Sequence, residues 1–160
     1  MRPTASPATV AALLLSLAAG GCGPPSRTPL DQAVAAAVQR YNEALPRAYA
    51  RADAGALQDV ASPDEVQRVH DLIGFLAQGK MIMEARQESF ALRGQAREEG
   101  PARASVEATE VWWYRHVVPA TGEVRQAPRR VRYANRYHLV QLDGRWRVDR
   151  LVETGFEELR

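Results

Sequence analysis

Residues 132–152, RYANRYHLVQLDGRWRVDRLV, contain two runs of alternating side chains on either side of Asp143-Gly144. An Asp-Gly pair between two such runs is typical of a two-residue β-hairpin turn, because both turn positions need positive φ. Together with Val131, the first run divides into an apolar and a polar face. The apolar face holds Val131, Tyr133, Tyr137 and Leu139, and the polar face Arg132, Arg136 and His138. We therefore predict an antiparallel sheet that buries one face.

Two more strand-like runs precede the hairpin, over residues 81–93 and 103–118, and the hairpin strands are expected over 130–142 and 145–153. Glycine and proline separate these runs, as turns require. One face of the second run is largely apolar, and it contains Ala104, Val106, Ala108, Trp112 and Tyr114. The pattern predicts four antiparallel strands in succession.

The residues before the strands have helical periodicity. From residue 30 to residue 52 apolar side chains recur every three or four positions, and Pro46 is expected to kink or divide this helix. A second helix is predicted from its N-cap Ser62 to about Gln78, with Gly79 ending it. Residues 30–160 should form an α+β domain, with N-terminal helices packed in a strongly curved antiparallel sheet of about four strands.

The first 21 residues are typical of a secretory signal: Arg2 precedes an apolar run over residues 8–19, and small residues follow it. The segment LAAGGC, residues 17–22, resembles a bacterial lipoprotein signal, which implies lipidation of Cys22 and a Pro/Gly tether over residues 22–29. The alternative is a soluble exported protein with a free thiol. By similarity to Gram-negative sorting signals, Gly23 favours the periplasmic face of the outer membrane.

Composition excludes several classes of protein. A single cysteine excludes an intrachain disulfide and a multi-thiolate metal site. The net charge of +2 comes from 21 basic and 19 acidic residues, which is not the excess typical of nucleic-acid binders. The three histidines lack ligand spacing, and no phosphate loop, nucleophile elbow or glycine fingerprint occurs. We expect no metal, no cofactor and no nucleic-acid partner.

Three stretches together resemble a known superfamily: YNEALPRAYARADAGAL (41–57), ASVEATEVWWYR (104–115) and the hairpin over 132–152. They are similar to the cystatin-like, nuclear-transport-factor-2-like (NTF2-like) superfamily. The nearest resemblance is to the IMS domain of plastid and cyanobacterial division proteins. The resemblance covers residues 29–153 and implies a cone-shaped sheet around helices. Superfamily members bind ligands, catalyse proton transfer, dimerise or bind proteins, so the fold alone selects no activity.

Adjacent residues of a strand point to opposite faces, so Trp113 should lie on the outer face of the sheet when Trp112 lies on the inner one. Val111 and Val117 share the phase of Trp113, and the three form a candidate interface for a second copy or an envelope protein. The alternative is burial beneath a loop over residues 119–128. Arg132 and Arg136 extend this candidate interface as a basic sheet face that suits anionic headgroups or an acidic protein. The alternative is a solvated face paired with glutamates.

Inside the cone, Tyr41, His116, Trp112 and Tyr114 are candidate ligand-binding residues, with Tyr41 and His116 near the mouth. None of the histidines stands in a catalytic constellation, so no catalytic residue is predicted. His138, on the polar face, is expected to be a cross-strand partner.

The leading hypothesis is a lipid-anchored, non-enzymatic envelope protein that acts as a protein-interaction or scaffold module. The alternative is a periplasmic binding protein for a small apolar or anionic ligand held in the cone. An isomerase or dehydratase-type enzyme comes third. An open cone with a polar tip would favour ligand binding, and a buried carboxylate at the end of the cone would favour an enzyme.

Overall fold

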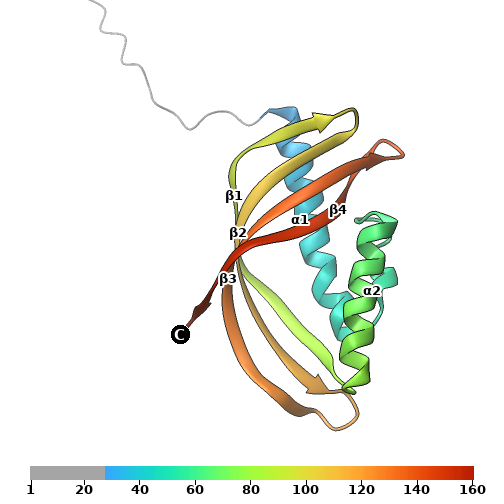
Figure 1. Ribbon diagram of the computed structural model, residues 1–160, viewed down its shortest axis with the longest axis vertical. Coiled ribbons are helices and arrows are strands. Elements are labelled where there is room, and N and C mark those ends of the chain that lie inside the picture. Colours follow the sequence, from blue (N-terminus) through green and yellow to red (C-terminus); the bar gives the residue numbers. More distant parts are fainter. Residues whose placement is uncertain (1–27) are drawn as a thin grey trace, which may run out of the picture.

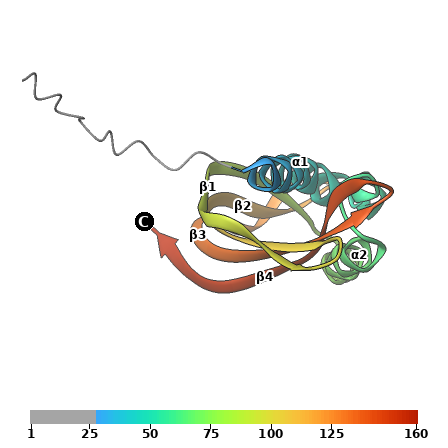
Figure 2. The same cartoon turned by 90° about the horizontal axis from the view of Figure 1, so that it is seen from above.

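The computed structural model describes residues 28–160, so the predicted signal peptide (1–21) and Cys22 lie outside the described residues. The chain forms helix α1 (Pro29–Arg51), a short 3-10 helix η1 (Ala54–Leu57), helix α2 (Pro63–Gln78) and four strands: β1 (Ile82–Gly100), β2 (Arg103–Val118), β3 (Glu123–Leu142) and β4 (Arg145–Leu159). The strands form one antiparallel sheet in the order β1-β2-β3-β4. The sheet bends strongly, and both helices lie on its concave side (Figures 1 and 2). The predicted α+β cone is confirmed.

Local signals set both helix starts. Thr28 caps α1, where its hydroxyl accepts the backbone N–H of Asp31 at 3.1 Å and the Asp31 carboxylate accepts the Thr28 N–H at 2.8 Å. Ser62 caps α2 as predicted. Pro46 does not divide α1, which runs as one helix to Arg51. Its missing N–H costs one hydrogen bond, and burial of the flanking α1 residues against the core offsets that cost.

The turn at Asp143-Gly144 has positive φ at both residues, 51° and 74°, as the predicted hairpin requires. Strands β1, β3 and β4 are longer than predicted, because register shifts let the ladders continue through polar segments. The expected loop over residues 119–128 is wrong: β3 starts at Glu123. Pro128 lies inside β3 at a register shift, where the ladder needs no donor.

The core lies between α1 and the inner face of the sheet. The ring of Tyr41 on α1 meets Tyr137 on β3 edge-to-face, with centroids 6.3 Å apart. The Tyr41 hydroxyl donates to Oε1 of the buried Glu65 on α2 at 2.7 Å, and Arg68 donates to the other carboxylate oxygen of Glu65 at 2.8 Å. A parallel bridge between Ala61 and β4 attaches the start of α2 to the sheet. These contacts fix both helices relative to the strands.

We predict that Asp31→Ala lowers the free energy of unfolding by about 2–4 kcal/mol, because it removes the α1 cap and leaves other donors unpaired. Besides Thr28, the Asp31 carboxylate accepts the backbone N–H of Ala96 on β1 at 2.7 Å. Urea unfolding measures the change. Asp64→Ala, an exposed acid in the first turn of α2, is the matched control and should cost less than about 1 kcal/mol. Equal losses in the two variants would contradict this role of Asp31.

Candidate functional site

The concave side of the sheet holds an open cavity of about 540 Å³. Its walls come from α1, α2 and all four strands. The apolar and aromatic lining is Leu45, Tyr49, Leu72, Met83, Ala85, Trp112, Tyr114, Tyr133, Tyr137 and Leu151, and the polar lining is Asn42, Glu110, His116, Gln126, Arg129, Asn135 and Glu153. A cavity of this size with mostly apolar walls and few polar groups is typical of small-molecule sites.

The inner end of the cavity is organised by Glu110 on β2, which is 1% exposed. Its carboxylate accepts hydrogen bonds from Nε1 of Trp112 at 2.6 Å, from Nε2 of Gln87 at 3.3 Å, from Nδ2 of Asn42 at 3.4 Å and from the hydroxyl of Tyr137. A buried carboxylate is stable only when donors replace its water. Four donors from α1, β1, β2 and β3 converge on this group, so it joins those elements.

Several tyrosines around the cavity are held in the protonated form. Burial, followed by the charge of Glu110, raises the pKa of Tyr137 well above its ordinary value. Burial, followed by the charge of Glu65, raises the pKa of Tyr49 to about 12. Burial and a hydrogen bond with Tyr114 raise the pKa of Tyr133. These hydroxyls therefore remain hydrogen-bond donors at neutral pH.

Three of the four predicted cone residues line the cavity: Trp112, Tyr114 and His116. Tyr41 does not, because its side chain points to Glu65 on α2 and is buried in the core. His116 packs against Tyr114 with ring centroids 6.1 Å apart, and its buried Nε2 has no hydrogen-bond partner among residues 28–160. Ligand binding by these residues stays a prediction.

Glu110, which is in phase with Ala108 and Trp112 on the inner face of β2, was not predicted from the sequence. That position in an apolar row was the available signal for a buried carboxylate. Arg129 on β3, another lining residue, was not predicted either, and its guanidinium donates to both oxygens of Glu158 at 2.9 and 2.5 Å. No pattern could identify that pairing before the strand register was known.

The outer face of the sheet does not carry the apolar patch that the sequence suggests. The ring of Trp113 lies under the guanidinium of Arg86, 4.2 Å from its centroid, with Arg115 at 5.7 Å. Val117 is 4% exposed and therefore cannot belong to an exposed patch. Trp113 is thus partly covered by arginines, and the predicted loop does not cover it.

The two arginines of the candidate interface are paired with glutamates across strands. Arg132 on β3 contacts Glu157 on β4 at 2.6 Å, and Arg136 on β3 contacts Glu107 on β2 at 2.7 Å. The hydrogen bond from Arg136 lowers the pKa of Glu107. His138 lies 3.0 Å from Glu99, as a cross-strand partner on the polar face. These contacts fit the alternative of a solvated sheet face whose arginines are paired with glutamates. An interface role stays a prediction for Val111, Trp113, Arg132 and Arg136.

Within the described part of the chain, no three His, Cys, Asp or Glu side chains are grouped closely enough to hold a metal ion. No helix from residue 28 onward has the length and hydropathy needed to cross a bilayer.

No protein-family model and no curated protein matches the chain in sequence. Among solved structures, the intermembrane space region of the chloroplast protein ARC6 is similar, with 15% identity, a TM-score of 0.67 and coverage of 81% of this chain and 98% of that one. A ketosteroid isomerase-like protein from Erwinia carotovora atroseptica SCRI1043 has 14% identity and a TM-score of 0.49, with 82% and 98% covered. A type 2 hexachlorocyclohexane dehydrochlorinase, LinA, has 14% identity and a TM-score of 0.49, with 83% and 94% covered.

The described residues define an α+β cone domain with a cavity on the concave side of its sheet. It has the NTF2-like fold and is similar to the intermembrane-space domain named above, as the sequence resemblance implied. At these identities the likeness extends to the fold and no further.

We predict that Glu110→Gln destabilises the fold by about 2–4 kcal/mol, since the new amide N–H₂ would face groups that themselves donate. Guanidinium unfolding measures the change. Glu107→Gln, on the same strand but on the outer face and 46% exposed, is the matched control and should cost less than about 1 kcal/mol. A Glu110→Gln protein as stable as wild type would show that the four-donor arrangement is not needed for folding.

Proposed function

We propose that the domain binds a small, uncharged and largely apolar molecule in the cone, and that Cys22 anchors the chain by lipid in the bacterial envelope. The observation that supports binding is the 540 Å³ cavity, which stays open between folded elements and has aromatic walls. An open cone with a polar tip was expected to favour ligand binding over a scaffold role. The paired arginines and the buried Val117 also remove much of the support for a scaffold face.

The charges around the cavity favour an uncharged ligand over the anion that the sequence left open. Glu110 and Glu153 line the cavity, and among the lining residues Arg129 is the only arginine or lysine. Arg129 is already paired with Glu158. An anion in the cavity would meet two carboxylates and one neutralised guanidinium, which is unfavourable in a partly desolvated site.

Binding without catalysis also fits the state of the buried carboxylate. A general base needs a lone pair directed at the substrate. Both oxygens of Glu110 already accept hydrogen bonds, two each. Glu110 therefore suits the role of a structural anchor that keeps Tyr137 and Trp112 in place, rather than that of a proton acceptor.

The binding proposal predicts that 1-naphthol, an uncharged aromatic probe, binds the protein and changes its tryptophan fluorescence, because Trp112 lines the cavity. The anion 1-naphthoate should bind at least several-fold more weakly. Ala85→Phe places a ring inside the cavity and should weaken 1-naphthol binding by about tenfold or more. Ala91→Phe, the same change at an exposed position of β1, should change it by less than about twofold.

Equal affinities in the two variants would locate the probe outside the cavity and contradict the proposal. Absence of 1-naphthol binding to wild-type protein at millimolar concentration would contradict it as well. Native mass spectrometry of gently purified protein is an independent readout, because a co-purifying small molecule should be lost in Ala85→Phe and retained in Ala91→Phe.

The anchoring proposal predicts that radiolabelled palmitate is incorporated into the wild-type chain in a Gram-negative host and not into Cys22→Ala. An acyl-modified cysteine would hold the protein in the membrane fraction, because each buried methylene contributes about 0.8 kcal/mol. Label retained by Cys22→Ala, or absent from both proteins, would show that Cys22 is not the anchor.

A further inference from the structure

The pairing of β1 with β2 is interrupted where β1 passes the N-terminal end of α1. Arg93 pairs with Glu107 and Arg97 with Ser105, so residues 94–96 stand opposite the single residue Val106 of β2. Gly94 takes a φ of +74°, which favours glycine, and allows the strand to bulge. The hydrogen bond from Ala96 to Asp31 ties this bulge to the first turn of α1.

Beside the bulge lies an open concavity of about 440 Å³ that is distinct from the cone cavity. Its charged lining is Arg93, Arg97, Arg136 and Glu107. Three guanidinium groups and one carboxylate give this concavity a net charge of +2. Elsewhere on the outer face of the sheet, most arginines have a carboxylate partner.

Two of these arginines have no salt-bridge partner within 4.0 Å among residues 28–160. Arg93 donates to the hydroxyl of Thr109 at 2.8 Å. Arg97 makes no hydrogen bond or salt bridge within the same part of the chain, although its charge, after that of Arg136, helps to lower the pKa of Glu107, and both arginine side chains are exposed. Arg136 is shared with Glu107. Unpaired guanidinium groups around a concavity suit a phosphate group, which accepts paired hydrogen bonds from arginine.

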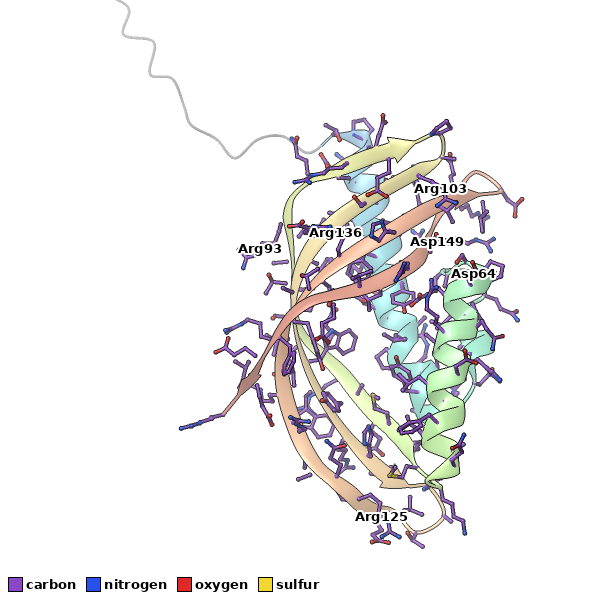
Figure 3. All side chains as sticks on the ribbon, in the orientation of Figure 1. Asp64, Arg93, Arg103, Arg125, Arg136 and Asp149 are labelled. Carbon is purple, nitrogen blue, oxygen red and sulfur yellow. The ribbon has the colours of Figure 1, made fainter. Side chains whose placement is uncertain are left out.

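The concavity lies in the same half of the domain as the start of α1, which is the end nearest in sequence to the proposed anchor Cys22. Figure 3 shows Arg93 and Arg136 in the half of the molecule in which α1 begins. Pro29, the first residue of α1, is seven residues after Cys22, a distance of at most roughly 25 Å for an extended chain. A chain acylated at Cys22 therefore keeps this end of the domain within reach of the headgroup layer.

We propose that Arg93, Arg97 and Arg136 bind the phosphate of anionic phospholipid headgroups and thereby orient the domain on its membrane. The lipid source of the phosphate rests on the anchoring proposed above. The cone cavity then lies on the opposite side of the sheet, separate from the membrane contact. Binding of an acidic protein or of free phosphate at these arginines, in place of lipid, would be a different outcome of the test.

The test uses residues 22–160 with Cys22→Ser, which contains every helix and strand of the fold and carries no acyl chain. Sedimentation with vesicles of phosphatidylglycerol and phosphatidylcholine should show binding, and vesicles of phosphatidylcholine alone should not. Arg93→Gln with Arg97→Gln should weaken binding by about 25-fold, at about fivefold for each arginine near an anionic surface. Arg40→Gln with Arg125→Gln removes the same charge at exposed positions outside the concavity and should weaken binding less than about threefold.

If both double variants weaken vesicle binding equally, the effect depends on net charge alone, and the proposal is overturned. Absence of binding to the anionic vesicles, or binding of inorganic phosphate at Arg93 and Arg97 without vesicle binding, would also overturn it. Arg97→Gln alone, which removes no hydrogen bond or salt bridge from the described residues, should give about a fivefold loss if the double variant does not fold. Binding of 1-naphthol should be unchanged in the arginine variants, so failure here is distinguishable from failure of the cone proposal.

Discussion

The carboxylate of Glu110 is the group on which the arrangement of the cone depends. It lies in a region where an unpaired charge would be expensive, and four donors from four different elements satisfy it. Because Tyr137 is held by Glu110 and also packs on Tyr41, the same contact sets the distance between the sheet and α1. The polar network is more specific than apolar packing, since a shift of register would leave its members unpaired.

This network also separates two regions of the concave face. On one side of it, small and aliphatic residues of β2, β3 and β4 pack against α1 and exclude solvent, and Ala104, Leu139 and Val148 are almost fully buried there. On the other side, larger aromatic side chains line a space between the strands and the helices that they do not fill. The cavity therefore results from the bend of the sheet together with a fixed polar group at its inner end.

The convex face follows a different principle. Arginines on this face pair with glutamates of other strands. Exposed pairs of this type contribute little to stability. Their main effect is therefore a polar and nearly neutral sheet surface. Arg93 and Arg97, beside the β1 bulge, lie outside this pairing. A neutral face with one basic concavity near α1 is consistent with a domain that has a ligand site on one side of the sheet and a membrane contact on the other.

Local features of the chain were predictable because neighbouring residues determine them. The Asp143-Gly144 turn needs only its own backbone conformation, the Ser62 cap only the next three residues, and the alternation of β3 only the pleat. The sequence by itself thus determined the four-strand sheet, the two helices and the inner positions of Trp112 and Tyr114.

Only the tertiary structure decided which of these residues meet. The donors to Glu110 are up to 68 positions away in the chain, so no local pattern could show that its burial is compensated. Val117, expected on the outer face, is buried, and the register of β3 and β4 gives Arg132 its glutamate. Burial, pairing and the open cavity all depend on strand register and sheet curvature, which arise from contacts between elements that are distant in the sequence.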